Sequence, residues 1–343
     1  MTTSTATPPA KSHRIKRRLK RGHRPNAFRF ADNPHIKPYI FNDLQGRYGH
    51  WPARDATATR TFVVVYGQHA SIERLIPIVE ALREFGDVYV ADNPGFGGME
   101  AAYKVGNYPD LPFYAAHLNH FITEHIPADR QLTLLGISFG FQMITELVAN
   151  YPAVAARTET AISFVGFVNP GDFDAPPLYT FILLKVLANG SRTRLGAGLF
   201  KLVVHEPVIV GIYRATKPIQ AKFKTLSGPE AKRYAREQAR LWVINDHRTH
   251  GATAWDFFKK NDLTMYRSNV PAIHIGVPND HIFDNTKVAE ELKAMYKEIT
   301  IMELNLPNHA PLDIDTPEQV RAILPPALLP VLSTSRNDGA VTS

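Results

Sequence analysis

The chain contains no cysteine among its 343 residues. Disulfide bonds, thiolate metal sites and a cysteine nucleophile are therefore excluded. It also lacks an apolar run of membrane-spanning length, because the longest candidate, Leu178 to Ala188, is too short and is interrupted by Lys185. Hydrophobic residues still make up 44% of the chain, which is enough for a substantial core in one large domain or two small ones.

Acidic residues are absent from the first 24 positions, which carry eight lysines and arginines. The net charge of the whole chain is +7, so the remainder carries −1 once those eight charges are set aside. A nearly neutral body gives no global charge signal for a nucleic-acid partner. A basic block behind a stretch rich in Thr, Ala and Pro is typical of a disordered tail, which we expect over residues 1–30.

This tail lacks the apolar stretch of a secretory signal peptide. A solvated tail is the favoured interpretation. The alternatives are a segment that contacts anionic membranes or nucleic acid, and an organellar transit segment. We therefore expect a cytoplasmic protein, with an organellar location as the alternative. The polar residues 331–343 are expected to form a second, loose tail.

Apolar runs alternate with segments of helical periodicity along most of the chain. Strands are expected over about 36–41, 47–51, 61–66, 87–91, 131–135, 161–168, 271–276 and 299–306. Helices are expected over about 71–85, 111–126, 139–150, 285–298 and 317–324. Such alternation predicts βαβ units and a mostly parallel sheet.

Residues 136–140 read Gly-Ile-Ser-Phe-Gly, between a predicted strand and a predicted helix. A strand, a sharp turn with serine at its apex and a helix together form a nucleophile elbow. Ser138 would then sit in strained backbone with its hydroxyl clear of the sheet. Gly136 and Gly140 would let the strand and the helix pass closely, since neither has a side chain. A glycine-rich turn that caps a helix is the alternative.

Four further patterns accompany this elbow: Tyr66-Gly67-Gln68-His69, Asp92-Asn93-Pro94-Gly95-Phe96-Gly97, the segment 275–280, and Asn308-His309. With these five patterns in this order, the chain resembles the α/β-hydrolase family over about residues 36–325. The four are similar to the family's oxyanion turn, its D-x-P-G-x-G loop, and the segments that carry its acid and its base. The resemblance implies an eight-stranded, mostly parallel α/β-hydrolase sheet with helices on both faces.

The alternation stops between residues 171 and 268, where the sequence looks helical and has no clear strand. The family places its lid as an insertion after the sixth strand. We therefore expect a hydrolase core over 31–170 and 269–330, with a helical cap over 171–268. A separate domain is the alternative.

A serine nucleophile needs a base, and the base needs a carboxylate to orient it. By its resemblance to the family, the chain offers Ser138, Asp280 and His309 in the required order. His309 follows the last apolar run, just past a strand end, where the active sites of open α/β sheets lie. Two other histidines lie near the predicted acid: His281 is adjacent to Asp280 but is interpreted as structural, and His274 is expected to be buried in a strand.

Three other carboxylates compete with Asp280 for the role of the acid. Asp172 and Asp174 follow the strand predicted over 161–168, and Asp284 lies further along the loop of Asp280. Asp280 is favoured because it stands four residues past Gly276, at the predicted strand end. Asp172 is instead expected to lie at the beginning of the lid segment.

The oxyanion of an acyl-transfer reaction needs two backbone N–H donors. The resemblance implies that these are the N–H groups of Phe139 and Gln68. The sequence departs from the family at Tyr66, where a histidine often stands, but a backbone donor does not depend on that side chain. His69 is expected to be a turn residue, with a pocket residue as the alternative.

No cofactor or metal is predicted. His247 and His250 are three residues apart and near Asp246, but a further ligand and a suitably spaced glutamate are missing. The glycines at 95, 97 and 98 do not form the G-x-G-x-x-G pattern of a nucleotide loop.

These residues predict a serine hydrolase that acts on a small carboxylic ester or a related acyl substrate through an acyl-enzyme. The alternatives are a carbon–carbon bond hydrolase or an acyltransferase with the same triad, and a hydrolase-fold binding protein with little turnover. Ser138 argues against the family's dehalogenases and epoxide hydrolases, which need a carboxylate nucleophile at that position.

Overall fold

A computed structural model describes residues 33–173, 178–203, 205–215, 228–278, 280, 283–304 and 316–333. Residues Pro34–Ser343 form one compact unit. The tail expected over residues 1–30 lies outside the described residues. At the other end, helix α14 (Leu328–Ser333) extends three residues into the stretch predicted as a second tail.

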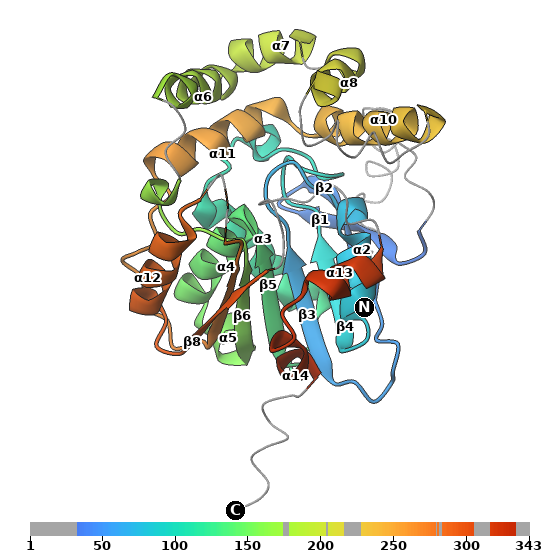
Figure 1. Ribbon diagram of the computed structural model, residues 1–343, viewed down its shortest axis with the longest axis vertical. Coiled ribbons are helices and arrows are strands. Elements are labelled where there is room, and N and C mark those ends of the chain that lie inside the picture. The colour runs from blue at the N-terminus through green and yellow to red at the C-terminus, as the bar shows by residue number, and fades with distance from the viewer. Residues whose placement is uncertain are drawn as a thin grey trace, which may run out of the picture. The chain divides into compact units, whose positions relative to one another are not determined.

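Eight strands form one sheet in the order β1-β2-β4-β3-β5-β6-β7-β8, as Figure 1 shows. Their bounds are β1 Ile36–Phe41, β2 Leu44–Trp51, β3 Arg60–Val65, β4 Gly86–Ala91, β5 Leu132–Ile137, β6 Thr158–Phe164, β7 Ala272–Gly276 and β8 Ile299–Glu303. Strands β1 and β2 pair antiparallel, β2 joins β4 antiparallel, and every other pair is parallel. The predicted eight-stranded, mostly parallel sheet is thus confirmed.

Local residue types account for the strands. All six residues of β3 are buried, as expected for a parallel strand that is covered on both faces. The β1–β2 hairpin turns at Asn42 and Asp43, whose φ angles of 47° and 64° suit a two-residue turn. Asn and Asp adopt such left-handed conformations more readily than most residues.

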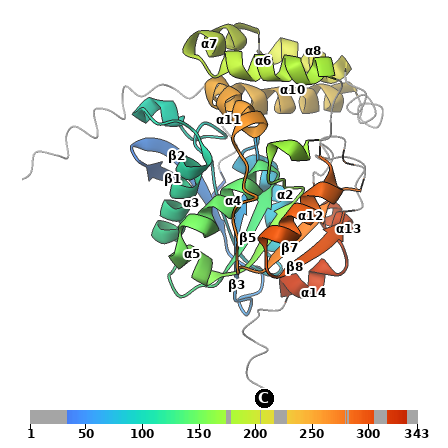
Figure 2. The same ribbon diagram turned by 90° about the vertical axis from the view of Figure 1, so that its left-hand side faces the viewer.

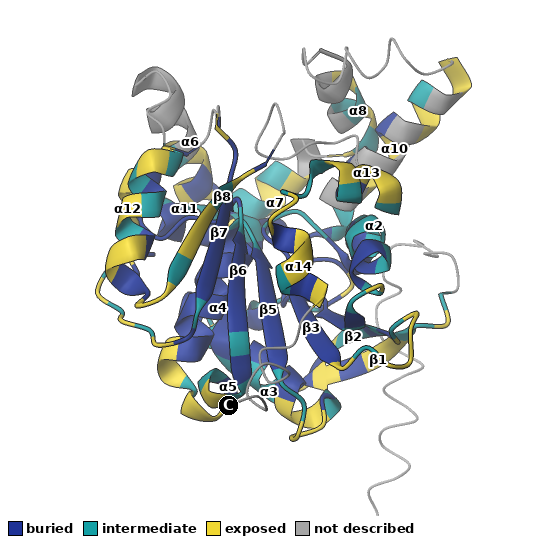
Figure 3. Cartoon of the chain, turned by 60° about the horizontal axis from the view of Figure 1, so that its bottom comes forward, coloured by how far each residue is buried: buried dark blue, intermediate teal, exposed yellow. Residues whose placement is uncertain are grey.

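Helices of the core flank the sheet in two groups. They are α2 Ile72–Leu82, α3 Leu111–His125, α4 Phe139–Asn150, α5 Pro152–Arg157, α12 Asn285–Met295, α13 Pro317–Ile323 and α14. Helix α3 packs beside α4, and α2 packs beside α13. Figure 3 shows these two pairs on either side of the buried strands. Helix α13 begins as the sequence indicates, with a Thr316 N-cap before a first-turn proline.

One predicted strand is displaced. The strand expected over 161–168 runs instead from Thr158 to Phe164. Val165 then adopts φ 49°, which is unfavourable for a β-branched residue, and the chain leaves the sheet. The next residues look like a strand in the sequence because they remain apolar, and Phe167 and Val168 are fully buried in the loop that follows.

The described residues between β6 and β7 are predominantly helical, as the loss of alternation indicates. After the short 3-10 turn η2 (Pro170–Asp172) come α6 Leu178–Ser191, α7 Arg194–Val203, α8 Glu206–Ala215, α10 Gly228–Ile244 and α11 His247–Lys259. We call these five helices the insertion helices. Figures 1 and 2 show α6, α7, α8 and α10 as an outer layer, with α11 between them and the sheet. No helix within the described ranges combines the length and the apolar character that a bilayer span requires.

Candidate active site

Ser138 forms the apex of a sharp turn between β5 and α4. Its backbone has φ 52° and ψ −120°, a conformation that side-chain-bearing residues rarely adopt. A Cβ at Gly136 would lie 2.5 Å from the Phe141 Cα, and one at Gly140 would lie 2.1 Å from the Val65 carbonyl oxygen. Both positions therefore require glycine, as expected of a nucleophile elbow.

The loop after β3 passes directly over this turn. A Cβ on Gly67 would lie 3.2 Å from the Ser138 Cβ and 3.3 Å from the Phe139 amide nitrogen. Gln68, the next residue, is therefore close to the elbow. Phe139 is 1% exposed and its amide begins α4. The structure thus brings together Ser138 and the segments of the two predicted N–H donors.

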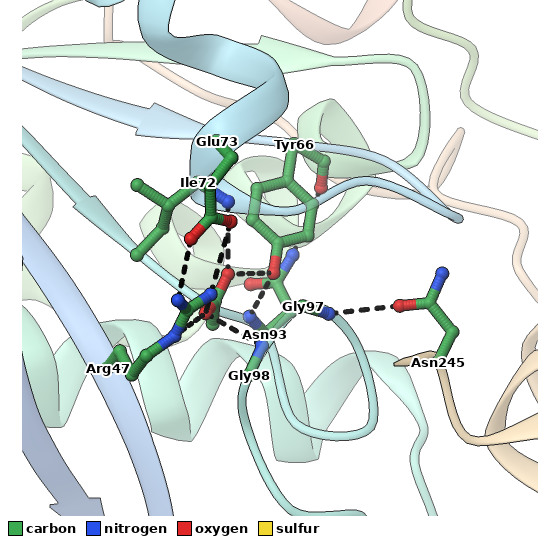
Figure 4. A network of polar contacts seen from close by, with 9 residues as sticks. Arg47, Tyr66, Ile72, Glu73, Asn93, Gly97, Gly98 and Asn245 are labelled. Carbon is green, nitrogen blue, oxygen red and sulfur yellow. Dashed lines mark hydrogen bonds and ion pairs between the residues drawn. The ribbon is translucent and has the colours of Figure 1, made fainter. Parts of the chain in front are cut away.

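Tyr66 anchors the loop after β3. Its hydroxyl donates to Asp92 Oδ1 at 2.9 Å and accepts from the Asn93 N–H at 2.8 Å. Asn93 Nδ2 donates back to the Tyr66 carbonyl oxygen at 3.0 Å. The phenol therefore fixes the loop that leads to Gly67 against the loop after β4, as Figure 4 shows.

Asp92 lies at the centre of the same network, fully buried. Its carboxylate accepts from the Gly98 N–H at 2.8 Å and from Arg47 at 2.7 Å, and Arg47 also pairs with Glu73. Burial raises the pKa of Asp92, while the Arg47 guanidinium acts in the opposite direction. Removing one partner of such a buried charge pair is far more destabilising than removing both. We interpret the network as the support of the site rather than as part of its chemistry.

Helix α11 contacts the loop after β3 through Gln68. The Gln68 side-chain amide donates to the Thr253 hydroxyl and lies 3.4 Å from the His250 carbonyl oxygen. The Thr253 hydroxyl in turn donates to the Thr249 carbonyl oxygen at 3.0 Å. The side chain of a predicted oxyanion residue is therefore held by an insertion helix.

A second link from α11 fixes the tautomers of two histidines. The Gly97 N–H donates to Asn245 Oδ1 at 3.0 Å, so the Asn245 amide nitrogen faces His69 Nδ1 at 3.4 Å and donates to it. His69 therefore carries its proton on Nε2 and donates it to His250 Nε2, 2.9 Å away. Both rings are neutral in this arrangement.

Burial lowers the pKa of both histidines. The pKa of His69 falls well below its usual value, with the neighbouring His250 as a further cause, and the pKa of His250 falls to about 3. A proton on His69 Nδ1 would face the Asn245 amide group, so the hydrogen-bond chain cannot accept it without rearranging.

This pair predicts a loss of stability in mild acid. A histidine kept neutral in the folded state binds its proton only after unfolding, so the unfolded state gains protons as the pH falls below about 6.5. The free energy of unfolding should then decrease by up to about 1.4 kcal/mol per pH unit for each such histidine. Denaturant unfolding between about pH 7 and pH 5 measures this slope.

The variant with both His69→Gln and His250→Gln should have a smaller slope than the parent chain, whatever its absolute stability. The remaining slope comes from other buried histidines, among them His117 and His274, whose pKa values burial lowers to about 3 and about 4. An unchanged slope in the double variant would show that the pair is not held neutral.

The predicted acid, Asp280, follows the carboxyl end of β7. Its side chain is nearly buried, and Oδ1 accepts from the Phe283 N–H at 3.3 Å. Strand β7 lies between β6 and β8, and β8 leads into residues 305–315, which contain His309. His309, His281 and Asp174 lie outside the described residues.

The competing carboxylates hold backbone groups. Asp172 is fully buried, and its Oδ2 accepts from the N–H groups of Val168 at 2.7 Å and Asn169 at 2.9 Å. Asp284 caps α12 by accepting from the Lys287 N–H at 3.1 Å. The roles of Asp172 and Asp284 are therefore structural. Asp172 also affects a neighbouring carboxyl group, because burial and the adjacent Asp172 together raise the pKa of Glu291 to about 7.

An aromatic wall that the sequence did not predict runs from the elbow to the loop of Asp280. Phe139 contacts Phe257 of α11 with ring centroids 4.6 Å apart, and Phe257 contacts Phe167 at 5.4 Å. Phe167 stacks on Phe283 at 4.5 Å. The wall joins four segments that are far apart in the sequence, and it makes this side of the site apolar.

His274 is buried in β7, as expected, where its Nδ1 lies 2.9 Å from the Ser163 hydroxyl. Within the described ranges no three His, Asp or Glu side chains are grouped so that they could hold a metal ion.

Comparisons with known proteins place this geometry in a fold. No protein-family model and no curated protein matches the chain. An epoxide hydrolase, CorEH, matches with a TM-score of 0.60 at 12% identity, covering 83% of this chain and 95% of that one. An enol-lactonase from Burkholderia xenovorans matches with a TM-score of 0.58 at 16% identity, covering 83% and 96%. MGS-M2, an α/β-hydrolase enzyme from a deep-sea metagenome library, matches with a TM-score of 0.60 at 13% identity, covering 88% and 98%. The chain therefore has the α/β-hydrolase fold.

Proposed function

We propose that this α/β-hydrolase-fold chain is a serine hydrolase that cleaves a carboxylic ester or a related acyl bond with Ser138. One observation carries the proposal: Ser138 stands at φ 52° on the turn between β5 and α4, with the backbone of Gly67 against the Phe139 amide. A serine in this strained position presents its hydroxyl at the carboxyl edge of the sheet, where substrates of open α/β folds bind.

In the proposed reaction, Ser138 Oγ attacks the acyl carbonyl carbon while His309 takes the hydroxyl proton. Asp280 orients His309 and stabilises its charged form. The N–H groups of Phe139 and Gln68 donate to the oxyanion. His309 then gives its proton to the leaving alcohol, and a water molecule, activated by His309, releases the acid from the acyl-enzyme.

We also propose that residues 171–268 form a cap over this site. The contacts of α11 with Gln68, His69 and Phe139 support it, because they bring an insertion helix onto the predicted oxyanion loop and onto the residue after the nucleophile. The cap would also place the apolar ring of Phe257 beside the acyl group.

Fluorophosphonate labelling followed by peptide mass analysis tests the nucleophile, and turnover of a short p-nitrophenyl ester tests the reaction. We expect a label on Ser138 and hydrolysis of the ester. Labelling without turnover would instead favour a binding protein. Product formation that depends on an added alcohol or amine would identify an acyltransferase, and cleavage of a β-diketone but not of esters would identify a carbon–carbon bond hydrolase.

A matched pair of threonine variants tests whether α11 positions the oxyanion donor. Thr253→Val removes the hydroxyl that holds the Gln68 side chain but keeps the shape of the residue. We expect kcat to fall by about tenfold with little change in KM, because loss of a whole oxyanion donor costs about a hundredfold or more.

Thr249→Val on the same helix is the control, since the Thr249 hydroxyl has no hydrogen-bond partner among the described residues. It should leave kcat unchanged. Equal losses of kcat in the two variants would show that α11 affects the site only through general packing.

A further inference from the structure

The nearly neutral body of this chain is the sum of two oppositely charged parts. Residues 171–268 contain 16 Lys and Arg against 8 Asp and Glu, a net charge of +8. Residues 25–170 and 269–343 together contain 15 Lys and Arg against 24 Asp and Glu, a net charge of −9. The insertion is therefore strongly basic and the core strongly acidic, which the total charge conceals.

The insertion also exposes apolar side chains. Of the eight large hydrophobic residues that the described part of the chain exposes, four lie on the consecutive helices α6 and α7: Val186 (62% exposed), Leu187 (46%), Leu195 (76%) and Leu199 (57%). Burying these side chains away from water would be favourable, so the surface is open to an apolar partner.

On α7, the exposed leucines lie apart from the face that meets α11. Leu195 and Leu199 are four residues apart on α7 and share one face of the helix. Phe200 instead packs on His247 of α11, with ring centroids 5.7 Å apart, and so marks the inner face. Exposed Arg194 and Lys201 lie on the same helix as the two leucines. Figures 1 and 2 show α6 and α7 in the outer layer, beyond α11.

We propose that this outer face of α6 and α7, defined by Val186, Leu187, Leu195 and Leu199 with their basic neighbours, docks on an anionic lipid bilayer. Leucines inserted at the headgroup boundary and lysines or arginines that contact anionic headgroups together make an interfacial binding surface.

The combination of apolar and basic groups favours a bilayer over two other anionic partners. A nucleic acid would satisfy the positive charge but would leave the leucines in water. A second copy of the chain would offer an acidic core. In the described part of that core, however, the exposed large apolar side chains are isolated on separate elements: Ile40 on β1, Ile301 on β8 and Leu329 on α14. A lipid surface satisfies both requirements at once.

Vesicle co-sedimentation of the full chain tests the proposal. We expect binding to vesicles of mixed phosphatidylglycerol and phosphatidylcholine, much weaker binding to pure phosphatidylcholine, and partial loss of binding when salt rises from about 0.1 to about 0.5 M. The Leu195→Gln, Leu199→Gln double variant keeps the net charge and should bind at least about tenfold more weakly. The Arg194→Gln, Lys201→Gln double variant should bind more weakly only to the anionic vesicles.

Ile40→Gln is the matched control, because Ile40 is also 62% exposed but lies on β1. It should bind as the parent does, and unchanged thermal unfolding should confirm that each variant is folded. No binding of the parent to anionic vesicles, or full binding of the leucine variant, would overturn the proposal and in the second case assign binding to another segment such as the basic tail. Two other results would overturn the proposal. Dimers in sedimentation velocity that require the leucines, without vesicle binding, would identify a second copy of the chain as the partner. Tighter binding to a DNA duplex than to vesicles would identify a nucleic acid.

Discussion

Ser138→Ala should abolish acyl turnover while leaving the fold intact. In a serine hydrolase with a complete triad, loss of the nucleophile lowers kcat by about a millionfold. The variant removes one hydroxyl and no carbon of the core, and alanine meets the same backbone strain at φ 52° that serine already meets. Thermal unfolding should therefore shift little, and a short p-nitrophenyl ester measures the loss of activity.

Ser71→Ala provides the control for this experiment. Ser71 lies two residues beyond His69 at the start of α2, and its hydroxyl is fully buried with no hydrogen-bond partner among the described residues. Its removal should leave turnover unchanged. If Ser138→Ala kept more than a few per cent of the parent rate, the nucleophile would have to be another residue.

The elbow could be predicted from the sequence because its geometry is local. Five residues decide the turn: two glycines allow the strand and helix to cross, and the serine between them accepts the strained backbone. The strands of the sheet were also predictable, since buried parallel strands read as continuous apolar runs. The same rule failed after Phe164, where the apolar residues Phe167 and Val168 are buried in a loop.

The contacts of α11 could not be predicted, because they join residues about 180 positions apart: Gln68 to Thr253 and His69 to His250. The sequence favours a turn residue at His69. Its φ of 56° agrees, yet its ring belongs to a hydrogen-bond chain that continues into α11. In the sequence, His247 and His250 stand three residues apart near Asp246, a pattern that bears on a metal site and does not indicate a contact with His69.

The place of each carboxylate in the fold bears on the choice of the acid. Asp172 accepts two N–H groups and Asp284 caps α12, so each has a structural task. Asp280 follows the carboxyl end of β7, the neighbour of the strand that leads to His309. This position supports Asp280 as the residue that orients the proposed base.

Asp280→Asn should therefore lower kcat by at least about a hundredfold, because asparagine keeps the size of the side chain but favours the wrong histidine tautomer, an effect of about ten-thousandfold in a serine protease. Asp172→Asn and Asp284→Asn should each lower kcat by less than about tenfold.

The two control variants should differ from each other in stability. Asparagine caps a helix as well as aspartate, so Asp284→Asn should unfold like the parent. Asp172→Asn places an amide in a fully buried site built around a carboxylate and should be less stable. The three variants are compared on one activated ester at about pH 7, with denaturant unfolding of each. If Asp172→Asn lost more activity than Asp280→Asn without a matching loss of folded protein, the acid would lie after β6 and the proposed triad would need Asp172 in place of Asp280.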